Sequence, residues 1–398
     1  MYTLDDVCKL ITDGSHFSPE DEGDGYPMLS VKDMEENDFN LSDCKRVGQE
    51  AYERLLANGC KPLVNDVVVA KDGSYLKTAF PIKENRDIAL LSSIAILRPD
   101  TDIVNPGYLS YFLKSETVYK TVSLNYISGT ALKRIILKGI KKIPISLPEI
   151  HEQSYRVSLL DSTRKVINQR KKQLELFDEL IKARFVEMFG NPFDVKTPVV
   201  WPIKTINDLA ESISDGSNVD KALYREQGDV LFLRIQNVWC NEFRLDDSVY
   251  ISESENEEYI DTSLKHGDLL ITKIGRYYTS DSSLGRVSVY LGDDDKANYS
   301  NNIMRVRFKE EINSEFANAL MNLDDYNKFI RRTSVGGTDK RALSKGLIAS
   351  YPVIVPSIEK QNEFVDFVHQ VDKSKVVVKK SLDETKKLFD SLMQEYFD

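Results

Sequence analysis

The sequence predicts a duplicated α/β (α+β) fold, in which two similar globular heads are joined by two long antiparallel coiled-coil helices. Three observations lead to this expectation. The chain repeats itself at a fixed spacing, each repeat mixes short apolar runs with amphipathic stretches, and each repeat ends in a heptad pattern. The length of 398 residues agrees, because a single hydrophobic core stops growing at roughly 250 to 300 residues.

The duplication is clearest near the end of each repeat. Six residues recur unchanged at one offset, which is far longer than the unit of a solenoid. Near the start, Ile11–Phe17 also resembles Ile213–Val219. The six matched residues are Gly129, Thr130, Pro144, Pro148, Ile150 and Gln153, which recur as Gly337, Thr338, Pro352, Pro356, Ile358 and Gln361.

Each head is expected to contain strands and helices. Short runs rich in Val, Ile and Leu, bounded by Gly, Asp, Asn or Pro, are typical of strands. Residues 106–124 and 314–332 carry apolar side chains at helical spacing, which predicts a helical stretch in each head. The expected strands include Val67–Ala70, Ile94–Leu97, Leu231–Ile235, Leu269–Thr272 and Val287–Leu291.

A long helix is expected after each head. Apolar residues recur in heptads there, which is the pattern of a coiled-coil seam. Two such seams in one chain most simply pack against each other, although a helix that only caps its own head is the alternative. The seam residues are Leu160, Ile167, Leu174, Ile181 and Met188 in the first helix and Phe364, Val371, Val378, Leu382, Phe389 and Leu392 in the second.

These patterns divide the chain into four segments. The first head takes residues 1–150 and the first helix residues 151–190, where Gly190 and Pro192 signal a helix stop. The second head takes residues 200–357, and the second helix takes residues 358–398.

The net charge of −10 argues at first against a protein that binds nucleic acid. The basic residues are concentrated, however, in two corresponding stretches. Residues 114–142 hold seven basic side chains and one acid, and residues 328–345 hold six and one. One such run is usually only a solvated surface, but two matched runs beside a Gly-Thr turn favour contact with phosphates.

A second basic and aromatic loop follows a central strand in each head. Lys and Arg can contact phosphate or guanine there, and hydroxyl side chains can read base edges. Together, the two kinds of loop predict these DNA-binding residues: Lys71, Ser74, Tyr75, Lys77, Thr130, Lys133 and Arg134 in the first head, and Lys273, Arg276, Tyr277, Tyr278, Thr338, Lys340 and Arg341 in the second.

Several function classes lack their signatures. The chain has no phosphate-binding Gly-rich loop of the P-loop kind and no Gly-x-Ser-x-Gly nucleophile motif. Its histidines and cysteines are too scattered to suggest a metal site, so no metal or cofactor is expected. Asp66 and Asp268 precede strands without the other groups of a nuclease site, and we expect them to close turns. No membrane span or signal peptide is apparent, which favours the cytoplasm.

Two heads, each followed by a long helix, resemble the specificity subunit of type I restriction-modification enzymes. The resemblance covers essentially the whole chain and includes the Asp-Gly-Ser-His start motif, whose Ser15 and His16 it marks as candidate DNA contacts. The second copy, with Ser217 and Asn218, replaces the histidine. His16 is equally suited to a local structural role.

The resemblance implies a subunit without catalytic activity. In that family each head reads one half of a bipartite double-stranded DNA site, and the antiparallel helices set the gap between the halves. The implied partners are two adenine-N6 DNA methyltransferase subunits and ATP-dependent translocase-nuclease subunits. Two alternatives remain open: a type IIB-like enzyme, whose partner fuses methyltransferase and nuclease, and a coiled-coil scaffold that binds proteins and no DNA.

Overall fold

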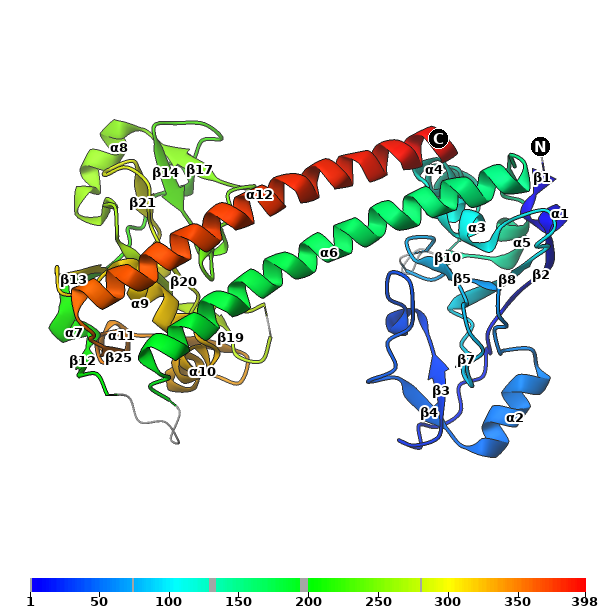
Figure 1. Cartoon of the computed structure of the whole chain (residues 1–398), viewed down its shortest axis with the longest axis horizontal. Helices are drawn as coiled ribbons and strands as arrows, with labels where there is room; N and C mark the ends of the chain where they lie inside the picture. The colour runs from blue at the N-terminus through cyan, green and yellow to red at the C-terminus, as the bar shows by residue number, and fades with distance from the viewer. Residues whose placement is uncertain (1, 74, 129–133, 194–199, 280) are drawn as a thin grey trace. The chain divides into compact units, whose positions relative to one another are not determined.

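The computed structural model describes residues 2–73, 75–128, 134–193, 200–279 and 281–398 (Figure 1). The chain divides into two compact units. Unit 1 comprises residues 1–171 and 380–398, and unit 2 comprises residues 172–379. Each unit therefore contains one head, the first part of one long helix and the last part of the other, so the division runs through the helices.

The first head is built on a four-stranded antiparallel sheet with the order β2-β8-β5-β6. A second sheet, β4-β3-β7, contains the parallel pair of β3 and β7. The strands are β1 Tyr2–Thr3, β2 Cys8–Asp13, β3 Tyr26–Leu29, β4 Lys45–Val47, β5 Val67–Ala70, β6 Ala79–Pro81, β7 Ala89–Leu90, β8 Ile94–Pro99, β9 Ile127–Ser128, β10 Arg134–Ile135 and β11 Pro144–Ile145. The helices are α1 Leu4–Val7, η1 Val31–Asp33, α2 Gln49–Ala57, α3 Pro106–Leu113, α4 Glu116–Asn125 and α5 Leu137–Lys141.

The second head repeats this plan, with the sheets β13-β22-β18-β20 and β17-β14-β21. The strands are β12 Ile203–Thr205, β13 Ala210–Asp215, β14 Val230–Leu233, β15 Val238–Trp239, β16 Glu242–Phe243, β17 Val249–Ile251, β18 Leu269–Thr272, β19 Ile274–Arg276, β20 Val287–Val289, β21 Ala297–Tyr299, β22 Ile303–Phe308, β23 Val335–Gly336, β24 Lys340–Ala342 and β25 Pro352–Ile354. The helices are α7 Ile206–Leu209, η2 Lys221–Leu223, η3 Ile235–Asn237, α8 Glu253–Glu258, η4 Ile260–Thr262, α9 Ser314–Met321, α10 Asp324–Thr333 and α11 Lys345–Ala349. The matched order confirms the duplication.

The helical stretch expected in each head is two helices rather than one. In the first head α3 ends at Leu113, and Ser115 caps α4 by accepting a hydrogen bond from the Val118 N–H at 3.3 Å. In the second head the break falls at Leu323, which is buried between α9 and α10. The apolar pattern continues across both breaks, so it does not reveal them.

Two helices of 40 residues follow the heads, α6 (Ile150–Phe189) and α12 (Ile358–Phe397). Gly190, at a φ of 80°, ends α6 in the left-handed conformation that favours glycine. Every predicted seam residue is buried or half-buried. The seam pattern thus identified the inner faces of both helices.

In each unit, the start of one long helix lies against the end of the other. In unit 1 the Arg156 guanidinium of α6 lies 4.7 Å from the ring centre of Tyr396 in α12. In unit 2 the Lys375 ammonium of α12 lies 2.7 Å from an Asp178 carboxylate oxygen of α6. This local pairing is the one that an antiparallel pair of helices makes.

Aromatic side chains join these helix segments to their head. In unit 2 the rings of Phe185 (α6) and Phe364 (α12) lie 5.2 Å apart, and Phe185 also packs at 5.2 Å against Phe316 of α9. In unit 1 the rings of Phe397 (α12) and Tyr108 (α3) lie 5.0 Å apart. The helix ends are therefore part of each hydrophobic core.

Candidate nucleic-acid interface

The Asp-Gly-Ser motif forms the same backbone bridge in both heads. The Ser15 N–H donates to the carbonyl of Leu90 at 2.7 Å, and the Ser217 N–H donates to that of Tyr299 at 2.9 Å. A Cβ at Gly216 would lie 2.3 Å from the Ser300 carbonyl oxygen, which excludes any larger residue without movement of the backbone. The motif thus connects the two sheets of each head.

The two motif serines also bond locally. The Ser15 hydroxyl donates to the Phe17 carbonyl at 2.6 Å, and the buried Ser217 hydroxyl bonds to Asn298 at 3.3 Å. His16 and Asn218 follow them as exposed side chains. The last residue of each motif is therefore presented to solvent, and it differs between the heads.

The lysines after the central strands are paired with the aspartate of this motif. The ammonium of Lys71 bonds to Asp13, and that of Lys273 bonds to Asp215. Lys71 is only 8% exposed, so a phosphate contact would require its pair to open. In the structure, these two predicted contacts hold the motif against the sheet.

The two basic loops of the second head meet in one three-stranded sheet, β19-β24-β23, which we call the basic sheet. Arg276 of β19 lies opposite Lys340 of β24, and the Arg341 guanidinium lies 3.8 Å from the ring centre of Tyr277. Tyr278 and Thr338 are exposed beside them. Loops more than sixty residues apart in sequence therefore present cations and aromatic rings together.

The first head pairs its loops in the same way. Arg134 forms a β-bridge with Asp72, and the Ile135 N–H donates to the Lys71 carbonyl at 3.0 Å. Arg134 and Lys77 are exposed. Ser74, Thr130 and Lys133 lie outside the described residues.

Tyr75 has an internal role. It is 4% exposed, bonds through its hydroxyl to the Ser123 hydroxyl at 3.1 Å, and stacks on Tyr119 with ring centres 5.4 Å apart. In the corresponding loop of the second head, Tyr277 is half-buried and Tyr278 is 76% exposed. The tyrosines of the two matched loops therefore differ in their exposure to solvent.

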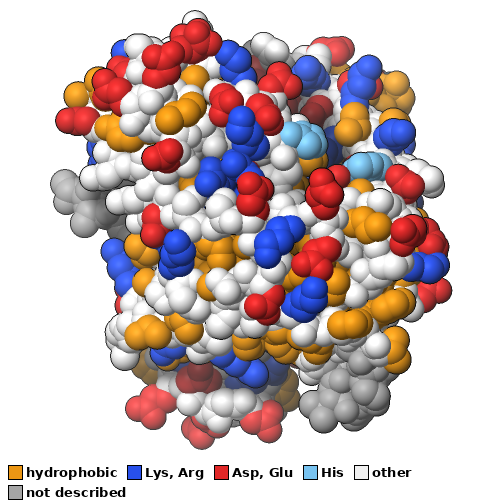
Figure 2. All heavy atoms as spheres, turned by 90° about the vertical axis from the view of Figure 1, so that its left-hand side faces the viewer, with side chains coloured by type: hydrophobic (Ala, Val, Ile, Leu, Met, Phe, Trp, Pro, Cys, Tyr) orange, Lys and Arg blue, Asp and Glu red, His pale blue; other side chains and the backbone are white. Residues whose placement is uncertain are grey.

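The two basic stretches carry less free charge than their composition suggests. Lys141 lies 3.1 Å from Asp5, and Lys120 lies 2.7 Å from Glu116. Figure 2 shows one face of the molecule, on which blue Lys and Arg and red Asp and Glu side chains are interspersed. Part of the positive charge in these stretches is therefore already paired within the protein.

Lys114, which the charge count included, has a buried ammonium nitrogen without a hydrogen-bond partner among the described residues. It lies 5.0 Å from the ring centre of Tyr111. Burial, together with the nearby Arg164, lowers the pKa of Lys114 to about 7. Lys114 is therefore a cost to stability near neutral pH rather than a contact for phosphate.

Replacing Lys114 with methionine is expected to stabilise the protein by about 1 to 3 kcal/mol at pH 6, because it removes an unbonded buried charge. The gain should shrink as pH rises from about 7 to about 10, where the folded chain already lacks the proton that an unfolded lysine keeps. Thermal unfolding at pH 6 and pH 9 measures this. Lys83→Met, at an exposed lysine, is the control; equal melting shifts in both variants would contradict the expectation.

Sequence reasoning missed a polar wall in the second head. The turn Ser300–Asn302 and the short helix η3 line two hollows beside the Asp-Gly-Ser motif and the basic sheet. The signal was present in the duplication, because Asn301 and Asn302 occupy the positions of Ser92 and Ser93. A comparison of the two repeats at these positions, which carry different polar side chains, would have indicated this surface.

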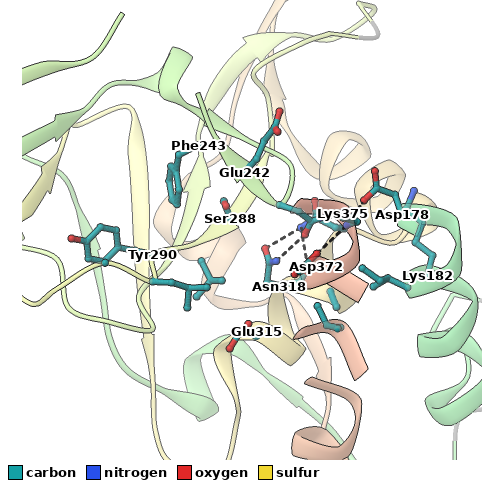
Figure 3. Close-up of a pocket in the computed structure, with 18 of the residues that line it drawn as sticks. Asp178, Lys182, Glu242, Phe243, Ser288, Tyr290, Glu315, Asn318, Asp372 and Lys375 are labelled. Atoms are coloured by element: carbon teal, nitrogen blue, oxygen red, sulfur yellow. Dashed lines mark hydrogen bonds and ion pairs between the residues drawn. The ribbon is translucent and has the colours of Figure 1, made fainter. Parts of the chain in front are cut away.

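Unit 2 also has a cavity of about 400 Å³ between its head and its helix segments (Figure 3). Phe243 and Val289 contribute to its apolar lining, and Lys375 faces it with its partner Asp178. The seam residue Ile181 lines it, whereas none of the predicted DNA contacts does. The cavity therefore lies where the head meets the two helices, away from the predicted DNA contacts.

Within the described parts of the chain, no cluster of three or more His, Cys, Asp or Glu side chains could hold a metal ion. Among the same residues, no helix is long and apolar enough to cross a membrane.

The model of the family described as "Type I restriction modification DNA specificity domain" matches residues 1–176 and 198–385. The chain belongs to this family. Two curated family relatives from Methanocaldococcus jannaschii are similar: a putative type I restriction enzyme MjaX specificity subunit, 20% identical over 243 residues, and the MjaIX specificity subunit, 23% identical over 172 residues. The matches cover 57% and 40% of this chain, and 56% and 39% of those relatives.

Two solved structures share the fold along nearly the whole chain. One is the S subunit of a type I restriction-modification system from M. genitalium, with a TM-score of 0.56 and 15% identity over 100% of this chain and 95% of that one. The other comes from a study of complex assembly and conformational transition of the type I R-M system, with a TM-score of 0.54 and 14% identity over 99% and 96%. At such identity, the likeness supports the duplicated family fold.

Proposed function

We propose that the chain is the non-catalytic DNA-recognition subunit of a type I restriction-modification complex. Each head reads one half of a bipartite double-stranded DNA site, and the long helices set the spacer and dock two adenine-N6 methyltransferase subunits. Translocase-nuclease subunits complete the complex for restriction, and the complex acts on DNA in the cytoplasm. Membership of the specificity family and the duplicated head are the basis of this proposal.

The observation that carries the proposal is the convergence of two loops in each head. In the second head, Arg276 and Lys340 lie side by side on the basic sheet, and Tyr278 is exposed next to them. In the first head, Arg134 and Lys77 are the exposed cations of the corresponding loops. Cations beside aromatic and hydroxyl groups suit a surface that meets phosphates and base edges.

A salt titration of DNA binding by the assembled methyltransferase complex tests the DNA role. Affinity should fall as salt rises, because each phosphate contact releases counterions. The double variant Arg276→Ala/Lys340→Ala should bind more weakly and lower the steepness of the log–log plot by about 2, or about 1 for each lost contact.

Lys204→Ala is the matched control, because Lys204 is exposed in the same unit and paired with Glu311 at 2.7 Å. It should leave the slope unchanged. Binding that does not respond to salt, or an absence of binding, would favour the protein-binding scaffold instead. If wild-type binding responds to salt but the double variant keeps the wild-type salt slope, the basic sheet is not the contact surface.

A further inference from the structure

Two adjoining hollows in the second head form one continuous polar surface. The first, of about 670 Å³, is lined by the residues after the Asp-Gly-Ser motif, by η3 and by the turn Ser300–Asn302. The second, of about 430 Å³, is lined by Arg276 and Lys340 of the basic sheet. Ile235 and Asn302 line both hollows. The surface therefore leads from the motif to the cations that we assign to phosphate.

Amide side chains on this surface have unused hydrogen-bonding groups. Within the described part of the chain, the side chains of Asn218, Asn301 and Asn302 make no hydrogen bond, whereas Gln236 donates to Asp247 at 3.1 Å and keeps its amide oxygen free. An unpaired amide with a donor and an acceptor side by side is suited to a ligand that presents the complementary pair.

The backbone beneath these amides is held in place. The Asn301 N–H donates to the Ser217 carbonyl at 3.0 Å, and the Asn302 carbonyl accepts from the Lys273 N–H at 2.9 Å. The turn lies between β21, which is buried along its length, and the buried start of β22. A contact made from this turn loses little conformational freedom on binding.

Two further polar atoms in the wall of the first hollow lack partners among the described residues. The Ser300 hydroxyl and the Nε of Arg234 are both buried and unbonded. Buried polar atoms are nearly always bonded, so these two atoms leave unused hydrogen-bonding capacity behind the surface of the hollow.

We propose that Asn301 and Asn302 are specificity-determining residues of the second head, and that they read adenine in the major groove of its half-site. Asparagine matches adenine there, because its amide accepts from N6 and donates to N7. Arg276 and Lys340 then lie at the adjoining hollow for the flanking phosphates. This inference rests on the proposed function and names the base that the site takes.

The first head has the same scaffold with different side chains. Leu91 bridges Ser15 as Ser300 bridges Ser217, and the Ser93 carbonyl accepts from Lys71 at 3.0 Å as that of Asn302 does from Lys273. The Ser93 hydroxyl, however, already accepts from the Val31 N–H at 3.1 Å. The matched turns thus present different chemistry, as two unlike half-sites require.

The test is to map methylated adenines in DNA treated with the complete methyltransferase complex, with the wild-type chain and with Asn301→Ser/Asn302→Ser. The variant carries the side chains of the first head. It should lose about 5- to 150-fold discrimination at one or two A·T positions of one half-site, while the other half and the spacer stay unchanged. Asn302→Asp should move one position from adenine towards cytosine, whose N4 donates to a carboxylate.

Gln227→Ala changes an exposed amide outside the two hollows and should preserve the motif. If the wild-type complex methylates a split motif and all three variants keep that motif unchanged, the assignment of Asn301 and Asn302 is overturned. The proposed function is then left intact. A wild-type complex that methylates no split motif would overturn the proposed function itself.

Discussion

Replacing Asp268 with alanine is expected to destabilise unit 2 by about 3 to 5 kcal/mol, because it breaks a buried ion pair from one side. Asp268 is fully buried, and its two carboxylate oxygens accept from the Arg307 guanidinium at 2.8 and 2.7 Å. One of them also accepts from the Lys265 N–H at 2.7 Å and so closes the turn before β18. The alanine variant leaves the cation and this N–H without partners.

Denaturant unfolding of the full chain measures this loss. Asp246→Ala, at an exposed carboxylate of the same head, should stay within about 0.5 kcal/mol of the wild type. The double variant Asp268→Ala/Arg307→Met should lose less unfolding free energy than Asp268→Ala alone, because no unpaired charge remains. A loss under about 1 kcal/mol for Asp268→Ala would mean that the pair does not hold the sheet.

The duplication extends this expectation to unit 1. Asp66 is 1% exposed, accepts from Arg98 at 2.8 Å through both oxygens, and closes its turn by accepting from the Leu63 N–H at 2.8 Å. Asp66→Ala should therefore show a similar loss in the other unit. Both aspartates close turns, as the sequence predicted.

Replacing Gln361 with alanine is expected to cost about 2 to 4 kcal/mol, because three backbone groups at the junction of head and helix lose their partner. Gln361 is fully buried at the start of α12. Its amide nitrogen donates to the carbonyls of Glu311 at 3.0 Å and Pro356 at 2.9 Å, and its oxygen accepts from the Asn313 N–H at 2.8 Å. The side chain thus ties α12, the preceding segment and the start of α9 together.

Gln370→Ala provides the matched control, because it removes an exposed glutamine from the same helix. Gln361→Glu should be at least as damaging as the alanine variant, since a carboxylate cannot donate to the two carbonyls. Gln153 makes the same three kinds of bond in unit 1. Equal unfolding free energies for Gln361→Ala and Gln370→Ala would contradict this role.

The features that follow from local pattern were predictable. Heptad spacing located the buried faces of α6 and α12, because side chains seven residues apart lie on one face of a helix. Leu160 and Phe364, for example, are fully buried. The repeated Gly, Pro and Gln residues likewise revealed the duplicated heads. Gln153 and Gln361, for example, each bond three backbone groups where a head joins its long helix.

The features that depend on contacts between distant residues were not predictable from one sequence. Lys71 reads as a free cation, yet its partner Asp13 lies on another strand. Lys114 reads as part of a basic surface, yet its ammonium is buried near Arg164 of the first long helix. Arg276 and Lys340 become neighbours only through the pairing of β19 and β24. The sequence shows where basic side chains are concentrated, and the fold decides which of them are exposed.

Mapping methylated adenines with the wild-type methyltransferase complex tests the central claim most directly. We expect every methylated adenine to fall in one bipartite sequence with two unlike halves and a spacer of fixed length. A contiguous motif, or methylation without sequence preference, would contradict a chain whose two heads each read one half of the site.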